Sequence, residues 1–163
     1  MHVSRKVLFL TALHLSMAGA FLLLAMRMLI LGTDGYFFLL WNGFLAAIPY
    51  VIAVLFERYV GKGARMTGGA WGVFLLWLFF FPNAPYIVTD FVHLPWEYIG
   101  SKMFAYDFVL IAAFAVAGLL FGMGALFRVH RALRRMIGFV WANFIMASAI
   151  FLSGFGVYLG RFL

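Results

Sequence analysis

Residues 81–97 read FPNAPYIVTDFVHLPWE, and this polar, proline-containing stretch interrupts a chain that is otherwise strongly apolar. Pro82 and Pro85 each lack a backbone N–H, and each obstructs a helix that arrives from the preceding residues. Asn83 followed by a proline suits the first turn of a new helix. The sequence therefore predicts a helix that breaks between Pro82 and Pro85 and then resumes.

The composition of the whole chain indicates a membrane protein. Of its 163 residues, 67% are hydrophobic and only 10% are charged, too few to cover a soluble globule with a polar surface. The absence of cysteine excludes disulfides, thiolate metal ligands and cysteine nucleophiles. The net charge of +7 is typical of basic residues held at a membrane surface, so we expect the lipid bilayer as a partner and no nucleic acid.

Five apolar segments are long enough to cross a hydrocarbon layer of about 30 Å as helices. The first follows two basic residues, as in a secretory signal, but its apolar run is longer than a signal's and favours an uncleaved span. We predict an all-α, polytopic transmembrane helical bundle in a single domain, residues 1–163, with the third span broken. The spans are expected at about residues 7–31, 36–56, 70–88, 104–127 and 137–159.

Basic residues alternate between the loops and predict the orientation. They precede the first span and follow the second and fourth, so these loops share one side, the cytoplasmic side by the positive-inside rule. The N-terminus is then cytoplasmic and the C-terminus extracytoplasmic, and acidic residues lie mainly toward the extracytoplasmic end. The basic residues are Arg5, Lys6, Arg58, Lys62, Arg65, Arg128, Arg131, Arg134 and Arg135, and the acidic ones are Asp34, Asp90, Glu97 and Asp107.

A helix that resumes after the break carries a polar residue at every third or fourth position, and such residues share one face. A break at membrane depth leaves backbone groups without partners, which is tolerated only inside protein or beside a water-filled cavity. We therefore predict a polar pocket in the extracytoplasmic half of the bundle. Its expected members are Asn83, Tyr86, Asp90 and His93, with Asn42, Glu97, Asp107 and Arg161 nearby.

The acidic and imidazole groups of this stretch permit three interpretations. Asp90, His93 and Glu97 are candidate ligands for Zn²⁺ or Mn²⁺, although no second histidine is near and no HExxH spacing is present. Asp90 and His93 are also candidate catalytic residues for acid–base chemistry or a proton relay. In the third, structural interpretation Asp90 pairs with a basic residue and His93 bonds a backbone carbonyl. The basic candidates are Arg27, Lys102 and Arg161.

Small residues in the last two spans indicate close helix packing. Gly118 and Gly122 have the GxxxG spacing, as do Gly156 and Gly160, and such faces let helix backbones approach closely. These glycine-rich faces are also the candidate surface for a homo-oligomer.

The stretch FPNAPYIVTDFVHL at residues 81–94 resembles the signature of a bacterial integral membrane family, domain of unknown function thirteen sixty-one. The resemblance implies a multi-pass protein of the bacterial cytoplasmic (inner) membrane, with no activity or site role to carry over. Family members usually continue beyond the GRFL motif, so it also implies a C-terminally truncated member. Similar stretches are WN at 41–42, IP at 48–49, YD at 106–107, GLL at 118–120 and GVYLGRFL at 156–163.

The biochemical function stays open among three classes. The predicted pocket suits a structural or assembly role, or the binding of a small ligand. A membrane-embedded enzyme, with or without a metal, would use Asp90 and His93 on a lipid-linked or periplasmic substrate. A small transporter is favoured by the broken helix, but the short chain and the lack of internal repeats mean that it would have to work as an oligomer. No particular cofactor is indicated.

Overall fold

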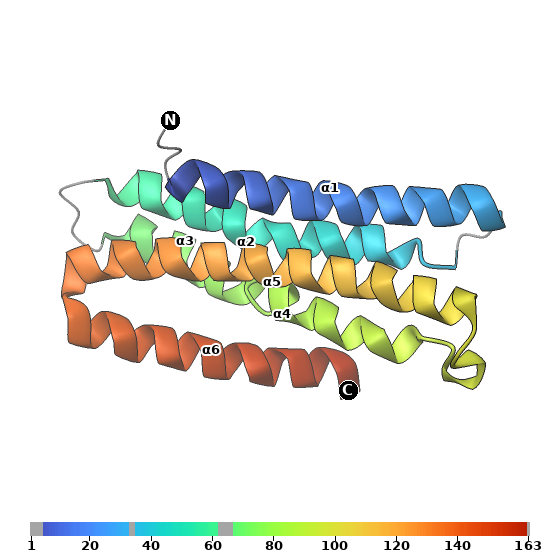
Figure 1. The fold of residues 1–163 in the computed structure, drawn as a ribbon. Helices are drawn as coiled ribbons and strands as arrows, with labels where there is room; N and C mark the ends of the chain where they lie inside the picture. Colours follow the sequence, from blue (N-terminus) through green and yellow to red (C-terminus); the bar gives the residue numbers. More distant parts are fainter. Residues whose placement is uncertain (1–4, 33–34, 62–66, 163) are drawn as a thin grey trace.

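The computed structural model describes residues 5–32, 35–61 and 67–162, and within these ranges the chain is helical, with no strand (Figure 1). The three basic or acidic loop residues Asp34, Lys62 and Arg65, used above to predict orientation, lie outside the described residues. The helices are α1 (Arg5–Leu31), α2 (Phe38–Val60), α3 (Gly68–Phe80), α4 (Asn83–Tyr86), α5 (Lys102–Ile137) and α6 (Phe139–Phe162), with 3₁₀ helices η1 (Ile87–His93) and η2 (Trp96–Tyr98).

Five of the described segments are long and apolar enough to cross a membrane, as the sequence predicts. The predicted all-α fold with five spans is confirmed, and the protein is a multi-pass membrane protein. The segments are Val7–Ile30, Phe38–Val60, Gly68–His93, Lys102–Ile137 and Phe139–Arg161.

Helix α5 is the centre of the bundle and contacts α1, α2, α4, η1 and α6. Its 36 residues extend over about 54 Å, well beyond a hydrocarbon layer of about 30 Å. The predicted fourth span ends near residue 127, before the arginines, whereas α5 continues through them. Arginine is a good helix former, so the helix ends only at Gly138, whose φ of 82° favours glycine.

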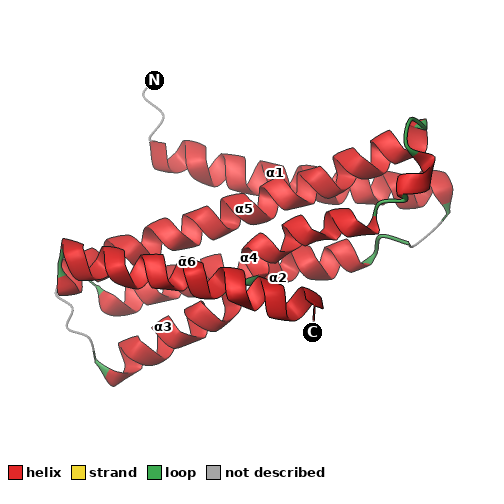
Figure 2. Cartoon of the chain, turned by 90° about the horizontal axis from the view of Figure 1, so that it is seen from below, coloured by secondary structure: helices red, strands yellow, loops and turns green. Residues whose placement is uncertain are grey.

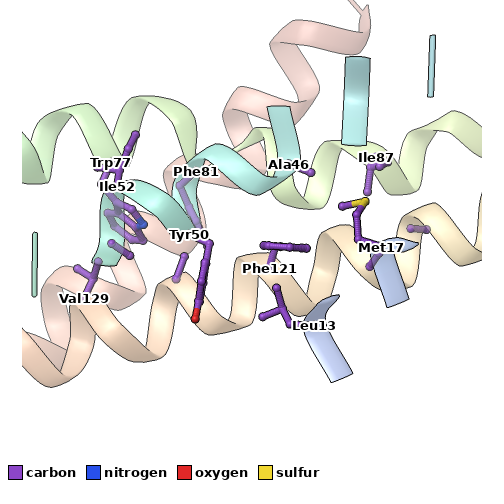
Figure 3. Packing of buried hydrophobic residues seen from close by; sticks show 14 of the residues in the cluster. Leu13, Met17, Ala46, Tyr50, Ile52, Trp77, Phe81, Ile87, Phe121 and Val129 are labelled. Carbon is purple, nitrogen blue, oxygen red and sulfur yellow. The ribbon is translucent and has the colours of Figure 1, made fainter. Parts of the chain in front are cut away.

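The interior of the bundle is filled by apolar side chains from α1, α2, α3 and α5 (Figure 3). Leu13 of α1 lies beside Phe121 of α5, and the rings of Phe121 and Tyr50 pack edge to face at 5.7 Å. Trp77 of α3 is fully buried near Ile52 of α2. Outward-facing apolar residues of the spans are exposed instead, as expected for side chains that contact lipid tails.

The third span is broken where the sequence predicts. Helix α3 ends at Phe80, the four-residue α4 begins at Asn83, and the chain then tightens into the 3₁₀ helix η1. Helix α4 lies near the middle of the bundle, between α2, α5 and α6 (Figure 2). The seven residues of η1 make an unusually long 3₁₀ helix, and such segments often mark functional or strained positions.

The glycines of α5 and α6 let the broken span enter the bundle. A Cβ added at Gly118 would lie 2.6 Å from Ile87 Cγ2, and one at Gly122 would lie 2.9 Å from Ala84 Cβ. On α6, a Cβ at Gly156 would lie 3.0 Å from Pro82 Cγ. These glycine spacings therefore allow close packing within the chain, since the break turns the third span toward α5 and α6.

Candidate functional site

A pocket of about 330 Å³ lies beside the break in the third span. It is bounded by α2 on one side, by the broken span on another and by the end of α6. Three of the predicted pocket residues line it, namely Asn42, Asn83 and Tyr86. The full lining is Trp41, Asn42, Leu45, Pro82, Asn83, Tyr86, Gly156 and Gly160.

Asn83 compensates for a hydrogen bond that the break removes. In a continuous helix the Ala84 N–H would donate to the carbonyl of Phe80, but here it donates to the carbonyl of Phe81 at 3.1 Å. The side-chain Nδ2 of Asn83 donates to the Phe80 carbonyl instead, at 2.9 Å. This contact assigns the amide orientation, because only the NH₂ group can donate to a carbonyl. The Oδ1 of Asn83 therefore stays available as an acceptor.

Asn42 connects the pocket to a buried carboxylate. Its Nδ2 donates to both carboxylate oxygens of Asp90, at 3.0 and 2.9 Å, and Asp90 is only 1% exposed. An amide oxygen would repel the carboxylate, so this contact assigns the orientation of Asn42 as well. The Oδ1 of Asn42 is then the second acceptor at the pocket.

The carboxylate of Asp90 has no cation in direct contact within the described parts of the chain. No arginine, lysine or histidine nitrogen there forms an ion pair with it. His93 and Arg161 act on it electrostatically from a longer distance. Arg161 lies in the last turn of α6, which is the side of the pocket where Gly156 and Gly160 lie. A buried carboxylate without a paired cation is energetically costly and marks a candidate functional group.

The 3₁₀ winding of η1 separates Asp90 from the pocket lining. A 3₁₀ helix has about three residues per turn, so Asp90 lies on the same face of η1 as Ile87 and His93. The sequence prediction assumed α-helical spacing, which would have placed Asp90 on the same face as Tyr86. Ile87 and Asp90 are both buried, and Tyr86 faces the pocket. The predicted residues therefore form two adjacent groups that Asn42 connects.

His93 lies at the exposed end of η1. Its ring packs against Phe38 at a centroid distance of 4.7 Å, and its carbonyl accepts from the Tyr36 hydroxyl at 3.4 Å. No hydrogen bond joins His93 to Asp90 in the described chain, so the geometry does not make them an acid–base pair. Glu97 is exposed on η2. Among the residues that the structure describes, no three His, Asp or Glu side chains lie close enough together to hold a metal ion.

Asp107 belongs to a different polar group from the one that the sequence predicts. It is 1% exposed and accepts from Arg27 Nε at 2.6 Å and from Arg27 Nη2 at 3.2 Å. The Tyr36 hydroxyl also donates to it, at 3.1 Å. Arg27 is one of three basic residues that the sequence offers as a partner for Asp90, but α1 packs against α5, which brings Arg27 to Asp107. The partners are 80 residues apart, and no local pattern in the sequence could pair them.

Tyr36 lies outside the membrane-spanning segments, between the first and second spans. Burial beside the Asp107 carboxylate, which accepts its hydrogen bond, raises the pKa of Tyr36 to about 12, although the nearby Arg27 guanidinium acts in the opposite direction. The guanidinium lies over the Tyr36 ring, 4.2 Å from its centroid. Arg27, Tyr36 and Asp107 thus form a buried cluster that joins the first span, the connection to the second span and the fourth span.

Comparisons with known proteins identify a family for this chain. Neither the curated proteins nor the solved structures include one that matches it. A family model described as "Protein of unknown function (DUF1361)" matches residues 41–163, which contain the broken span, the pocket lining, α6 and all of α2 except its first three residues. The chain therefore belongs to this family of proteins of unknown function.

Proposed function

We propose that the pocket beside the broken span binds a small organic ligand that carries a protonated amine. The single observation that carries this proposal is the arrangement of Asn42 and Asp90. The NH₂ group of Asn42 donates to the buried carboxylate of Asp90, so the Oδ1 of Asn42 remains to accept a hydrogen bond in the pocket. A site built in this way is negatively polarised.

The hydrogen-bonding character of the lining supports a ligand that donates. Asn83 also uses its NH₂ group inside the protein, and the Tyr86 hydroxyl donates to the Gly160 carbonyl at 3.4 Å. Three side-chain oxygens at the pocket, those of Asn42, Asn83 and Tyr86, can accept a hydrogen bond, and the one further polar side-chain group of the lining is the Trp41 indole N–H, a donor. An ammonium group carries up to three N–H donors and no acceptor, so it complements these oxygens.

Charge and aromatic surface favour the same class of ligand. The Asp90 carboxylate lies one hydrogen bond behind the pocket, and a bound cation would offset its charge. The rings of Trp41 and Tyr86 line the pocket, and aromatic faces attract cations. We further propose that the pocket opens toward the extracytoplasmic side, because the clustered arginines at the opposite end of α5 would lie in the cytoplasm.

Thermal unfolding of the detergent-purified protein tests this proposal. Ethanolammonium chloride is expected to raise the Tm more than sodium chloride at the same ionic strength, because only ligands that bind the native state stabilise it. Asp90→Asn is expected to weaken binding about tenfold or more, because it removes the negative charge that lies one hydrogen bond behind the pocket. Glu97→Gln, which neutralises an exposed carboxylate on η2, is the matched control and should bind as the wild type does.

The structural alternative predicts a different pattern. If Asp90 only holds Asn42 in place, Asp90→Asn will lower the Tm and ethanolammonium will have no effect on any variant. Equal stabilisation by ethanolammonium and sodium chloride in the wild type would likewise reject the binding role.

A further inference from the structure

Two cavities of opposite character lie along α5, and neither belongs to the pocket described above. The first lies between α5, α6 and the broken span, and the second is lined by α5 residues that contact the start of α6. An apolar groove of about 510 Å³ is lined by Leu119, Met123 and Leu126 of α5 and by Ile150, Gly154 and Val157 of α6, among others. A basic cavity of about 610 Å³ is lined by Phe127, His130, Arg131, Arg134 and Arg135.

The two cavities follow one another along the same face of α5. Residues 119, 123, 126, 130 and 134 are spaced by three or four positions, which places them on one side of a helix. From residue 119 to residue 134 the helix rises about 22 Å, close to half the thickness of a bilayer with its headgroups. The pair of cavities therefore extends over the depth of one lipid leaflet.

The basic cavity has more positive than negative charge around it. Glu57 is the one carboxylate that contacts its arginines in the described chain, and it bonds Arg135 at 3.2 Å and lies 3.7 Å from Arg131. Arg128 also binds Glu57, so three guanidinium groups share a single carboxylate. The guanidinium of Arg134 lies over the ring of Phe139, 5.0 Å from its centroid, which leaves its N–H donors for an anion. Guanidinium groups match phosphate oxygens in geometry and charge.

The apolar groove faces the bilayer. Met123 and Ile150 are each 52% exposed, so the groove is open on the lipid-facing surface of the bundle. A lipid acyl chain can therefore enter it from the bilayer. Near the basic cavity, His130 Nε2 of α5 and Asn143 Oδ1 of α6 are hydrogen-bonded at 2.8 Å, and this bond connects the two helices.

We propose that the α5–α6 interface binds an anionic phospholipid, with its phosphate in the basic cavity and an acyl chain in the apolar groove. The positive charge of the basic cavity favours a phosphate. The apolar groove begins at Leu126, next to Phe127 of the basic cavity, and favours a ligand that also carries a hydrocarbon chain. Neutral lipids would fill the groove but lack the excess charge that the arginines recognise. This proposal is independent of the ligand proposed for the pocket beside the break.

Native mass spectrometry of the detergent-purified full chain tests both halves of the site. The probes are phosphatidylglycerol, phosphatidylcholine and glycerol 1-phosphate, the last being the phosphate headgroup without chains. We expect the protein to prefer phosphatidylglycerol to phosphatidylcholine, and glycerol 1-phosphate to compete weakly. If glycerol 1-phosphate binds as tightly as the lipid, the site is for free phosphate and the lipid proposal is rejected.

Two variants separate the contribution of the lipid headgroup to binding from that of the acyl chain. Arg134→Gln is expected to weaken phosphatidylglycerol binding about fivefold and to leave phosphatidylcholine binding unchanged. Gly154→Leu fills the groove, and there is open space for it because nothing lies within 4 Å of a Cβ at this position. It should weaken both lipids equally, by about fourfold for each methylene group displaced.

Matched controls keep the result interpretable. Arg58→Gln removes a charge near the end of α2 without touching the basic cavity, and Gly19→Leu adds the same side chain at another open helical position on α1. Both should bind lipid as the wild type does, with unchanged helical circular dichroism. Unaltered lipid selectivity in Arg134→Gln together with unaltered affinity in Gly154→Leu would overturn the proposal.

Discussion

Arg27 and Asp107 form a buried ion pair, with 2.6 Å between Nε and Oδ1, that joins the first span to the fourth. The Arg27 side chain is 10% exposed and the Asp107 side chain 2%, so neither charge has much access to solvent. A buried pair of this kind is held by its own attraction and by the Tyr36 hydroxyl, which donates to the same carboxylate. Removing either partner leaves the other as an uncompensated charge.

Breaking this pair should therefore destabilise the protein strongly. Arg27→Gln or Asp107→Asn is expected to lower the free energy of unfolding by about 3–5 kcal/mol. The double variant Arg27→Met with Asp107→Leu should recover most of that loss, because no buried charge remains. Denaturant unfolding of the purified protein followed by circular dichroism measures both effects, and a double variant no better than the singles would contradict this explanation.

The Tyr36 hydroxyl should ionise at a higher pH than that of an ordinary tyrosine. Its pKa of about 12 is higher than the usual value of about 10, so the neutral phenol is favoured in the folded protein. The resulting contribution to stability is fully present below pH about 10 and is lost as the pH rises toward about 12. Absorbance at 295 nm during an alkaline titration should show a late phase, and Tyr36→Phe should remove that phase while the other tyrosines titrate as before.

Asn42 and Asp90 should show strong energetic coupling. Asn42→Leu removes the donor that both carboxylate oxygens use and is expected to cost about 1–3 kcal/mol. In the double variant with Asp90→Leu the buried charge is gone, so the two costs should not add. A double-mutant cycle on unfolding free energies gives the coupling, and simple additivity would show that the contact contributes nothing.

The glycines on α5 and α6 should differ in their tolerance to alanine. A Cβ at Gly118 would lie 2.6 Å from Ile87 and 3.2 Å from the Ala84 carbonyl, so Gly118→Ala should cost about 1–3 kcal/mol through overpacking. Gly154 has open space at the same position, and Gly154→Ala should be neutral or stabilising by up to about 1 kcal/mol. Thermal unfolding of the two variants side by side compares them, and equal Tm values would contradict the packing.

Orientation can be tested directly because the chain has no cysteine. A single cysteine at Glu97, on exposed η2, should react with a membrane-impermeant maleimide in intact cells. A cysteine at Gly68, at the start of α3, should react only after the cells are opened, since the positive-inside rule assigns that end to the cytoplasm. The reverse labelling pattern would invert the proposed topology and move the pocket to the cytoplasmic side.

Several features of the fold could be read from local sequence. Long apolar runs have to be helical in lipid, because every backbone hydrogen bond must be made within the segment, so the spans were predictable without any tertiary information. The break at Pro82 and Pro85 was equally predictable, because proline lacks the N–H that a continuous helix requires. The spacing of Asn83 and Tyr86 and the depth of Asn42 led us to expect these residues near one another, and all three line the pocket.

Other features were decided by tertiary packing. The conversion of residues 87–93 to a 3₁₀ helix turned Asp90 away from Tyr86, and no propensity rule foretells that winding. The choice of Asp107 rather than Asp90 as the partner of Arg27 depends on which helices touch, and charge attraction alone does not distinguish two carboxylates at similar depth. The apolar runs and prolines thus determined the number of spans and the place of the break, since those follow from each segment's own backbone. Which polar groups meet depended on contacts between segments far apart in the chain.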